Sequence, residues 1–443
     1  MIGIVMFFAA LCMLAIGYPV AFTFGSVSIF FGAGAAIIEM MPGASISGIF
    51  EEFFLMFSMM PFRIYSIMNN TILMAIPLFI YMGIILQKSD LAERLLEAMG
   101  TLFGKVRGGV AVSTVLVGTL LAASTGVVGA SVVAMGVISL PVMLKYGYSK
   151  KLATGTICGA GTLGQIIPPS IVLIILGDVF QEPVGDLFKA AVLPGLILVG
   201  LYIVYILVLA FINVDVAPPI KSDSTLSRGP NIRKALIAII PPLTLIVLVL
   251  GSIFEGIATP TESASVGAVG SMVLAAMYKK LDLKIVMDSL HETVKITAMV
   301  FAILIGATAF SMVFVYSGAD YIVEDFLTNL PGDKWAFLIL SMLSIMALGF
   351  FIDFIEISYI VVPILLPIAD AIGLNPLWFA ILIAMNLQTS FLTPPFGFSL
   401  FYLKGVSPPE VKTTDIYKGV MPFIAIQVAV LISIVIFPGF YGF

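Results

Sequence analysis

Charge is scarce in this chain: Asp, Glu, Lys and Arg make up 10% of its 443 residues, whereas 60% are hydrophobic. Soluble domains carry about 25% charged residues, so this composition excludes a soluble globular protein. Apolar runs long enough to cross a bilayer recur along the chain, at 64–86, 191–212, 235–253, 293–316 and 419–437. The sequence therefore predicts an all-α polytopic membrane protein embedded in a lipid bilayer, with no separate soluble domain.

Cysteine and histidine are almost absent, with two Cys and one His. Cys12 and Cys158 lie in apolar segments and are predicted to be unpaired core thiols, which excludes a disulfide scaffold or a cysteine metal cluster. His291 lies near a charged helix end, where a surface position is favoured over a proton relay. With no histidine pair and no HExxH helix, an intramembrane enzyme is disfavoured. We expect no enzymatic activity, no cofactor and no nucleic-acid partner.

A first membrane helix, not a cleaved signal peptide, is expected at the N-terminus, because "MIGIVMFFAALCML" lacks a basic region. Further along, the chain contains a repeat. Pro141, Gly147 and the pair Pro168-Pro169 recur as Pro367, Gly373 and the pair Pro394-Pro395, each 226 positions later. A proline pair that interrupts a hydrophobic segment at matched places in two halves indicates the binding site of a secondary transporter.

The two repeats carry opposite charge biases. Segments 88–108 and 145–151 of the first repeat hold seven Lys and Arg residues, whereas the matching segments 318–334 and 367–376 are acidic apart from Lys334. By the positive-inside rule, the first set is cytoplasmic and the second is external. The basic, Pro- and Ser-rich segment 213–234 is then a flexible cytoplasmic linker. Homologous units of opposite orientation form an inverted repeat.

Each repeat is predicted to contain a re-entrant hairpin followed by a broken helix. About 37 apolar residues separate Arg107 from Lys145, and both ends of this stretch are basic. One helix cannot begin and end on the same side, so the stretch should turn back at a Gly/Ser/Thr-rich tip within 120–136. The second hairpin, 335–366, has its tip within 347–358. The broken helices that follow should break at 164–170 and 390–397, because proline removes a backbone donor and clashes with the preceding turn.

Unwound backbone in a membrane requires a protein or aqueous environment. Free carbonyls and hydroxyls suit Na⁺, and the positive end of a helix dipole suits a carboxylate. For one such segment, a role in helix packing is the alternative to a binding site. Two such segments at matched spacing in the two repeats favour a binding site. The Na⁺ candidates are Ser124, Gly126, Gly164, Ile167, Gly349, Asp353, Ser390, Thr393 and Gly397. The substrate-binding candidates are Ser124, Thr125, Ser131, Pro169, Ser170, Thr389, Thr393, Pro394 and Pro395.

Two carboxylates, Asp353 and Glu356, lie in an apolar segment three residues apart. Buried carboxylates of membrane proteins usually carry ions or protons, although Glu356 facing a watery cavity at the hairpin mouth is an equal alternative. Glu262 opens a helix with Thr259 or Thr261 as its cap, and we favour capping over a substrate role.

Several segments resemble the large membrane (M) subunit of tripartite ATP-independent periplasmic (TRAP) transporters. They are "AIPLFIYMGIIL" (75–86), "GAGTLGQIIPPSI" (159–171), "LFKAAVLPG" (187–195), "GIATPTESAS" (256–265), "PILLPIADAIGLNPLWFAI" (363–381) and "TPPFGFSLF" (393–401). Many members carry an "SGSS"-like first tip where this chain has "STGVVGAS" (124–131). The ligand-facing role among Ser124, Thr125 and Ser131 therefore stays open.

The resemblance implies an elevator-type fold similar to divalent anion/sodium symporters, with Na⁺ as the coupling ion. It implies a small four-helix membrane subunit and a periplasmic binding protein as partners in the bacterial inner membrane. Scaffold segments would be 1–107, 179–333 and 405–443, and the transport domain halves 108–178 and 334–404. We expect Na⁺-coupled uptake of a small organic acid. The alternative is a self-sufficient Na⁺- or H⁺-coupled anion symporter, and a passive channel is disfavoured.

Overall fold

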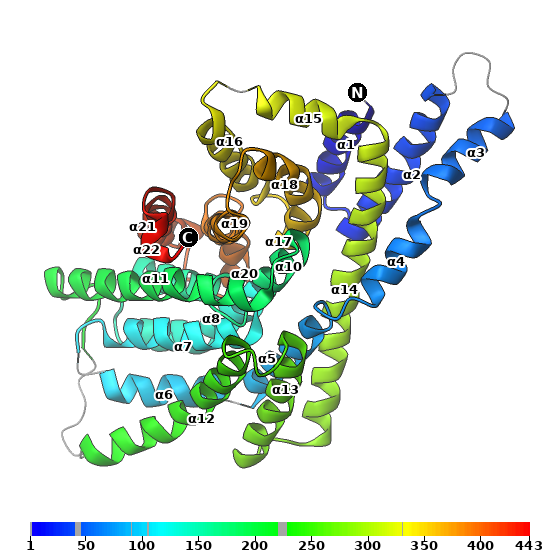
Figure 1. Cartoon of the computed structure of the whole chain (residues 1–443). Helices are drawn as coiled ribbons and strands as arrows, with labels where there is room; N and C mark the ends of the chain where they lie inside the picture. Colours follow the sequence, from blue (N-terminus) through cyan, green and yellow to red (C-terminus); the bar gives the residue numbers. More distant parts are fainter. Residues whose placement is uncertain (1, 40–45, 90, 104–105, 220–227, 330) are drawn as a thin grey trace. The chain divides into compact units, whose positions relative to one another are not determined.

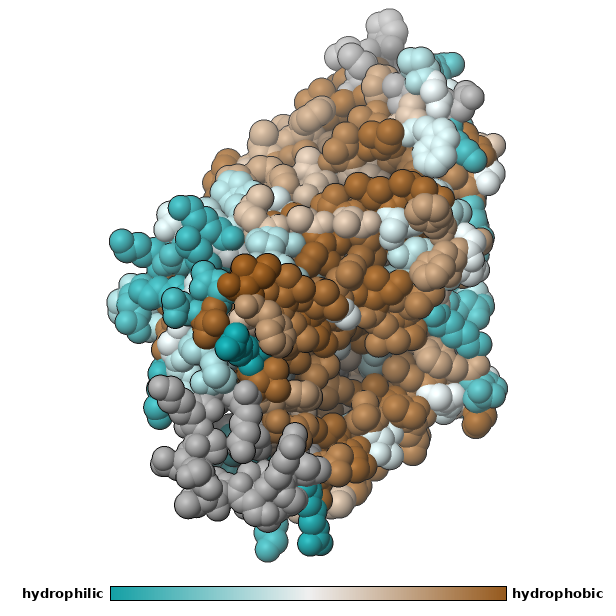
Figure 2. Space-filling model, turned by 90° about the vertical axis from the view of Figure 1, so that its left-hand side faces the viewer, coloured by the Kyte–Doolittle hydropathy of each residue, from teal (hydrophilic) through white to brown (hydrophobic). Residues whose placement is uncertain are grey.

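The computed structural model describes residues 2–39, 46–89, 91–103, 106–219, 228–329 and 331–443. All regular secondary structure in these ranges is helical, which confirms the predicted all-α class. Seven of the described helices are long and apolar enough to cross a membrane. Figure 2 shows a face covered mostly by hydrophobic side chains, with hydrophilic ones gathered in a few places. The chain is therefore a multi-pass membrane protein.

The chain divides into two compact units. The first contains residues 1–73 and 295–376. Its helices are α1 (Ile2–Ile16), α2 (Val20–Glu39), α3 (Ile46–Met56), α4 (Met60–Met68), the later part of α14 (Leu283–Tyr316), α15 (Ala319–Thr328), α16 (Asp333–Leu348), α17 (Phe354–Glu356), the π-helical turn η2 (Ile357–Val361) and α18 (Val362–Ala371). Figure 1 shows α14 as one long, uninterrupted helix.

The second unit contains residues 74–294 and 377–443. Its helices begin with α5 (Ala75–Lys88), α6 (Leu91–Phe103), α7 (Gly109–Thr125), α8 (Val128–Lys145), α9 (Lys150–Thr162), the 3₁₀ turn η1 (Leu163–Gln165) and α10 (Ile171–Phe180). They continue with α11 (Val184–Ile212), α12 (Arg228–Phe254), α13 (Pro260–Met277), the first part of α14, α19 (Pro376–Leu392), α20 (Phe398–Val406), α21 (Thr413–Ile436) and α22 (Pro438–Tyr441).

Helix boundaries repeat with the offset seen in the sequence. Helix α8 begins at Val128 and α17 at Phe354, and α9 begins at Lys150 and α19 at Pro376. Both pairs are 226 residues apart, as are the ends of α8 and α18 at Lys145 and Ala371. The two repeats therefore share one pattern of helices: a hairpin and then a helix broken at its proline pair.

The broken helices are the most deeply buried elements of the second unit. Every residue from Leu152 to Thr162 in α9 and from Trp378 to Leu392 in α19 is buried. Helix α9 packs along α21 so closely that a Cβ added at Gly155 would collide with the carbonyl oxygen of Gly419. Such contact between small residues is the usual way for membrane helices to pack closely.

Two expected segments differ from the structure. The apolar run 64–86 is not one helix, because α4 ends at Met68 and α5 begins at Ala75. In the turn between them, the Asn70 side chain accepts the backbone N–H of Ile72 at 2.9 Å, and this local hydrogen bond competes with helix formation. The linker predicted at 213–234 is shorter, since α12 begins at Arg228; residues 220–227 lie outside the described part of the chain.

The prediction for the cysteines is half right. Neither forms a disulfide, and Cys158 is buried in α9, but Cys12 is exposed on α1. Helix α1 is apolar around its whole circumference, as expected of a helix that faces lipid, so an apolar neighbourhood in the sequence did not indicate burial within the protein.

Candidate functional site: two broken helices and their hairpins

The first interruption, which we call break 1 (residues 166–170), lies where it was predicted. It separates η1 from α10 and contains a cis Pro168–Pro169 peptide bond. The buried Ser170 closes it: its hydroxyl donates to the carbonyl of Gln165 at 2.6 Å and accepts the N–H of Leu173 at 3.4 Å. Ser170 is thus the N-cap of α10, and the free backbone N–H groups of this helix begin at the break.

Hairpin 1 (α7 and α8) turns at Gly126, whose φ of 62° ends α7 directly after Thr125. The Thr125 and Ser131 hydroxyls lie 2.8 Å apart and hydrogen-bond to each other across the turn, and Ser131 also donates to the carbonyl of Val127 at 3.2 Å. The side chain of Ser124 lies outside the described residues. Two of the three hydroxyls predicted at this tip therefore form one buried pair.

The tip of hairpin 1 lies directly against break 1. A Cβ added at Gly126 would lie 2.8 Å from Cγ1 of Ile171, the first residue of α10. A Cβ at Gly164 would lie 2.5 Å from the carbonyl oxygen of Ala122, near the end of α7. Only glycine leaves room for this approach at both places. The predicted pairing of the first tip with the first proline pair is thus observed.

Sequence reasoning missed Gln165, the residue that ends η1. Its side chain is fully buried, and neither its amide nitrogen nor its amide oxygen has a hydrogen-bond partner among the described residues. An unpaired buried polar group costs about 1–3 kcal/mol, so such groups usually meet a ligand, an ion or a water molecule. The signal was present in "GAGTLGQIIPPS" (159–170), where Gln165 is the only residue with an amide side chain.

Break 2 (residues 393–397) separates α19 from α20 and contains a cis Pro394–Pro395 bond. The break starts three residues later than the predicted 390, so Ser390 belongs to helix α19, as Thr389 does. Their hydroxyls donate to the carbonyls of Met385 and Leu387, both at 2.8 Å. Thr393 stands at the break itself and donates to the carbonyl of Thr389 at 2.8 Å.

A second buried glutamine accompanies break 2. Gln388 is fully buried in α19, and again both amide atoms lack a partner in the described part of the chain. Each proline pair is thus preceded by a buried amide group, three residues before Pro168 and six residues before Pro394. The segments 162–171 and 388–398 contain no charged residue. The available polar groups at the breaks are therefore neutral amides, hydroxyls and backbone atoms.

The two broken helices run in opposite directions. At one end, the Lys150 ammonium at the start of α9 donates to the carbonyl of Glu410, in the loop after α20, at 2.7 Å. At the other end, the ring of Phe180 at the end of α10 lies 5.9 Å from that of Phe379 at the start of α19. Between them, the thiol of Cys158 in α9 contacts the carbonyl of Ser399 in α20 at 3.7 Å. This antiparallel arrangement is the one that the opposite charge biases predicted.

Hairpin 2 belongs to the first unit and is built differently at its tip. Helix α16 ends at Leu348, residues 349–353 form the turn, and Asp353 caps α17 by accepting the N–H of Phe354 at 2.7 Å. Glu356 is 1% exposed, and its Oε2 atom has no partner among the described residues. Ser358 lies inside the helix, in the π-helical turn. The pairing of Gly349 and Asp353 with break 2 stays a prediction.

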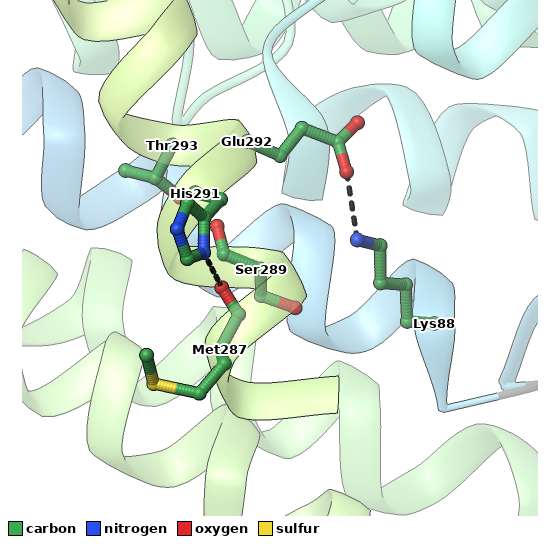
Figure 3. A network of polar contacts seen from close by, with 6 residues as sticks. All are labelled: Lys88, Met287, Ser289, His291, Glu292 and Thr293. Atoms are coloured by element: carbon green, nitrogen blue, oxygen red, sulfur yellow. Dashed lines mark hydrogen bonds and ion pairs between the residues drawn. The ribbon is translucent and has the colours of Figure 1, made fainter. Parts of the chain in front are cut away.

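Two residues were assigned to structural roles, and the structure confirms both. Glu262 and Thr259 form a capping box at the start of α13: the Thr259 N–H and hydroxyl donate to the carboxylate, each at 2.8 Å. These bonds hold the pKa of Glu262 below its ordinary value. His291 is exposed and bonds through Nδ1 to the Met287 carbonyl of its own helix, while the neighbouring Glu292 pairs with Lys88 at 2.8 Å (Figure 3).

Comparisons with known proteins agree with this architecture. The family described as "Tripartite ATP-independent periplasmic transporter, DctM component" matches residues 5–440. The C4-dicarboxylate TRAP transporter large permease protein DctM of Pseudomonas aeruginosa is 32% identical over 85% of this chain and 86% of its own length. The sialic acid TRAP transporter large permease protein SiaM of Vibrio cholerae is 26% identical over 84% of this chain and 86% of its own length.

Two further likenesses concern assembly and fold. The isethionate TRAP transporter permease protein DctMQ of Oleidesulfovibrio alaskensis is 28% identical over 94% of this chain, which spans 64% of that longer protein. The crystal structure of the YdaH transporter of Alcanivorax borkumensis shares the fold, with a TM-score of 0.64 over 98% of both chains at 13% identity. From its family match and its relatives, the chain belongs to the DctM component family of tripartite ATP-independent periplasmic transporters.

Proposed function

We propose that this protein imports a small organic acid across the bacterial inner membrane, driven by Na⁺ that moves with the substrate. The observation that carries the proposal is the pair of antiparallel broken helices with a buried, unpaired amide before each proline pair. Helices interrupted in matched places of two repeats form the substrate and ion sites of secondary transporters. A purely structural core would leave Gln165 and Gln388 unpaired at a cost in stability.

We propose that one ion binds where break 1 meets hairpin 1, and that a second ion uses the candidate ligands of the second repeat. At break 1 the ligands would come from Ser124, Gly126, Gly164 and Ile167, and Gln165 adds an amide oxygen. In the second repeat the candidates at break 2 are Ser390, Thr393 and Gly397, and Gly349 and Asp353 of hairpin 2 stay candidates from the sequence. Carbonyl and hydroxyl oxygens are the ligands preferred by hard cations. Glu356 and Asp353 are the residues that would carry protons if the coupling ion were H⁺.

The substrate is proposed to be an anion held without a positively charged side chain. The N-terminus of α10, capped by Ser170, offers free N–H groups and a positive dipole end for a carboxylate. The other proposed contacts come from Thr125, Ser131 and Pro169 in the first repeat and from Thr389, Thr393, Pro394 and Pro395 in the second. The relatives named for C4-dicarboxylates, sialic acid and isethionate all carry acids, which supports this class.

Transport would require two partners, a small membrane subunit and a periplasmic binding protein. The isethionate relative, named as a DctMQ permease, is longer than this chain, which is consistent with a fused second component. We further propose an elevator movement, in which the hairpins and broken helices slide against the remaining helices. Its support is the tight contact of hairpin 1 with break 1, which would let these elements move together.

Coupling can be tested in proteoliposomes that contain the chain with both partners, using labelled succinate and N-acetylneuraminate as probes. Uptake of an accepted probe should require an inward Na⁺ gradient and stop when K⁺ replaces Na⁺. Equal uptake on a proton gradient in Na⁺-free buffer would contradict Na⁺ coupling. It would instead favour Asp353 and Glu356 as proton carriers. Full uptake without the partners would instead indicate the self-sufficient symporter. If neither probe is accepted, thermal unfolding in Na⁺ and K⁺ tests ion binding directly.

A further inference from the structure

Four segments that lie far apart in the sequence meet at one edge of the second unit. The N–H of Gly108 donates to the carbonyl of Ala217 at 3.1 Å, and the N–H of Ser149 donates to that of Val216 at 2.9 Å. The Lys150 ammonium reaches the carbonyl of Glu410 at 2.7 Å. The segments around Gly108, Ser149 and Ala217 were predicted to be cytoplasmic. The segment around Glu410 should lie on the same side, because successive membrane helices alternate in direction. We call the region formed by these four segments the basic edge.

The basic edge carries an excess of positive charge. Its Lys and Arg residues are Arg107, Lys145, Lys150, Lys151, Lys404 and Lys412, and its acids are Asp215, Glu410 and Asp415. Two of the lysines, Lys150 and Lys404, are tied to the backbone carbonyls of Glu410 and Val411, each at 2.7 Å. Lys145, at the end of α8, makes no ion pair with any residue that the structure describes. Its charge is therefore not neutralised by an ion pair within the described part of the chain.

A cavity opens into this edge between α8 and the loop after α20. Its volume is about 740 Å³, within the range of about 300–1,000 Å³ typical of small-ligand sites. Lys145, Lys150 and Tyr148 line its polar end, with Ser407 and Glu410. Val137, Pro141 and Leu144 form its apolar wall along α8. The cavity is thus amphipathic, with its charged end at the basic edge.

The apolar wall continues onto an exposed apolar surface of α8. Val137 is 57% exposed and Val142 is 40% exposed on α8, which is one of the helices long enough to span a bilayer. An exposed apolar face that ends at Lys145 and Lys150 matches a molecule with an acyl chain and an anionic head. Basic pockets between membrane helices on the cytoplasmic side bind the head groups of anionic lipids.

We propose that this cavity binds an anionic phospholipid, with its phosphate at Lys145 and Lys150 and one acyl chain along Val137 and Pro141. Free phosphate shares the head-group chemistry, but it would leave the apolar wall of the cavity uncovered. The lipid would hold the end of hairpin 1 next to the loop after α20, because the cavity walls come from both. This site is distinct from the breaks, so its test does not depend on the proposed transport function.

Native mass spectrometry of the purified chain tests the proposal, with phosphatidylglycerol or phosphatidylcholine added after delipidation. Phosphatidylglycerol should bind more tightly, and Lys145→Gln should weaken it about fivefold, the effect of one lysine near a lipid surface. Lys284→Gln, an exposed lysine outside the cavity, is the matched control and should change nothing. Because the attraction is electrostatic, raised salt should weaken binding to the wild type more than to Lys145→Gln.

The apolar wall of the cavity allows a second, independent test. Val137→Gln should weaken phosphatidylglycerol binding while leaving the weak binding of inorganic phosphate unchanged. The proposal is overturned if phosphatidylcholine binds equally well, or if Lys145→Gln and Lys284→Gln behave alike. It is also overturned if inorganic phosphate competes as strongly as the lipid, because the cavity would then be a site for free anions.

Discussion

Replacing Gln165 by leucine separates the stability of break 1 from its function. Leucine has nearly the same volume, so the core around η1 should remain filled. The substitution removes two buried polar atoms that have no partner among the residues that the structure describes. Each such atom costs about 1–3 kcal/mol, so Gln165→Leu should raise the free energy of unfolding by at least about 2 kcal/mol in Na⁺-free buffer.

Sodium should reduce or remove this difference in stability between the variant and the wild type. A ligand present at 100 times its dissociation constant stabilises the folded state by about 2.7 kcal/mol. If the amide oxygen of Gln165 contacts the ion, the wild type gains this stabilisation and the leucine variant loses most of it. Thermal unfolding in Na⁺ and in K⁺ measures both effects, and reconstituted uptake should fall about tenfold or more in the variant.

Thr156→Val is the matched control. Thr156 lies in α9, the helix that leads into η1; it is fully buried, and its hydroxyl also lacks a partner among the described residues. It stands ten residues before break 1, so its replacement should stabilise the protein without changing the response to Na⁺ or the uptake rate. If Gln165→Leu destabilises the protein without Na⁺, or transports like the wild type, the reasoning about the buried amide is wrong.

Three further predictions concern packing, capping and topology. Gly164→Ala should destabilise the protein by about 1–3 kcal/mol, because the added Cβ would meet the carbonyl of Ala122. Gly200→Ala is the control: nothing lies within 4 Å of its added Cβ, so it should stabilise the protein by up to about 1 kcal/mol. Thermal unfolding measures both effects. Thr259→Ala should cost about 1 kcal/mol by loss of the N-cap. The pKa of Glu262 is lowered in the folded state, so its ionised carboxylate contributes to stability at neutral pH, and this contribution is lost as the pH falls. The melting temperatures of the wild type and Glu262→Gln should therefore differ at pH 7 and converge below about pH 4. In a Cys12→Ser background, Lys151→Cys should label from the cytoplasm and Asn375→Cys from the periplasm, and labelling of both from one side would contradict the inverted repeat.

The main features of the fold followed from the sequence because each had a local physical cause. A proline pair must interrupt a helix wherever it occurs, so the positions of Pro168-Pro169 and Pro394-Pro395 located both breaks. Lysine and arginine set orientation by their distribution alone, and the observed contact of Lys150 with the loop after α20 confirms the opposite directions.

What the sequence did not reveal depended on contacts between distant segments. Ser390 was placed in break 2 and Thr389 directly before it, yet each hydroxyl bonds to a carbonyl of its own helix, which composition does not show. Gln165 and Gln388 look ordinary in the sequence, and only the folded core shows that both amides are buried and unpaired. Cys12 was placed in the core, because lipid-facing and core-facing positions of a wholly apolar helix look the same.

The contact of Cys158 with Ser399 has a consequence for the membrane potential. Break 2 ends two residues before Ser399 and, because the two broken helices run antiparallel, lies beside the residues that follow Cys158. Break 1 begins eight residues after Cys158, so the two breaks are offset by about six residues, or about 9 Å at 1.5 Å per residue. For an α9 axis along the bilayer normal, this stagger is about 30% of a hydrocarbon core about 30 Å thick. Ions held at the two breaks would then differ in electrical energy by about 0.7 kcal/mol per 100 mV, so voltage would act unequally on their binding.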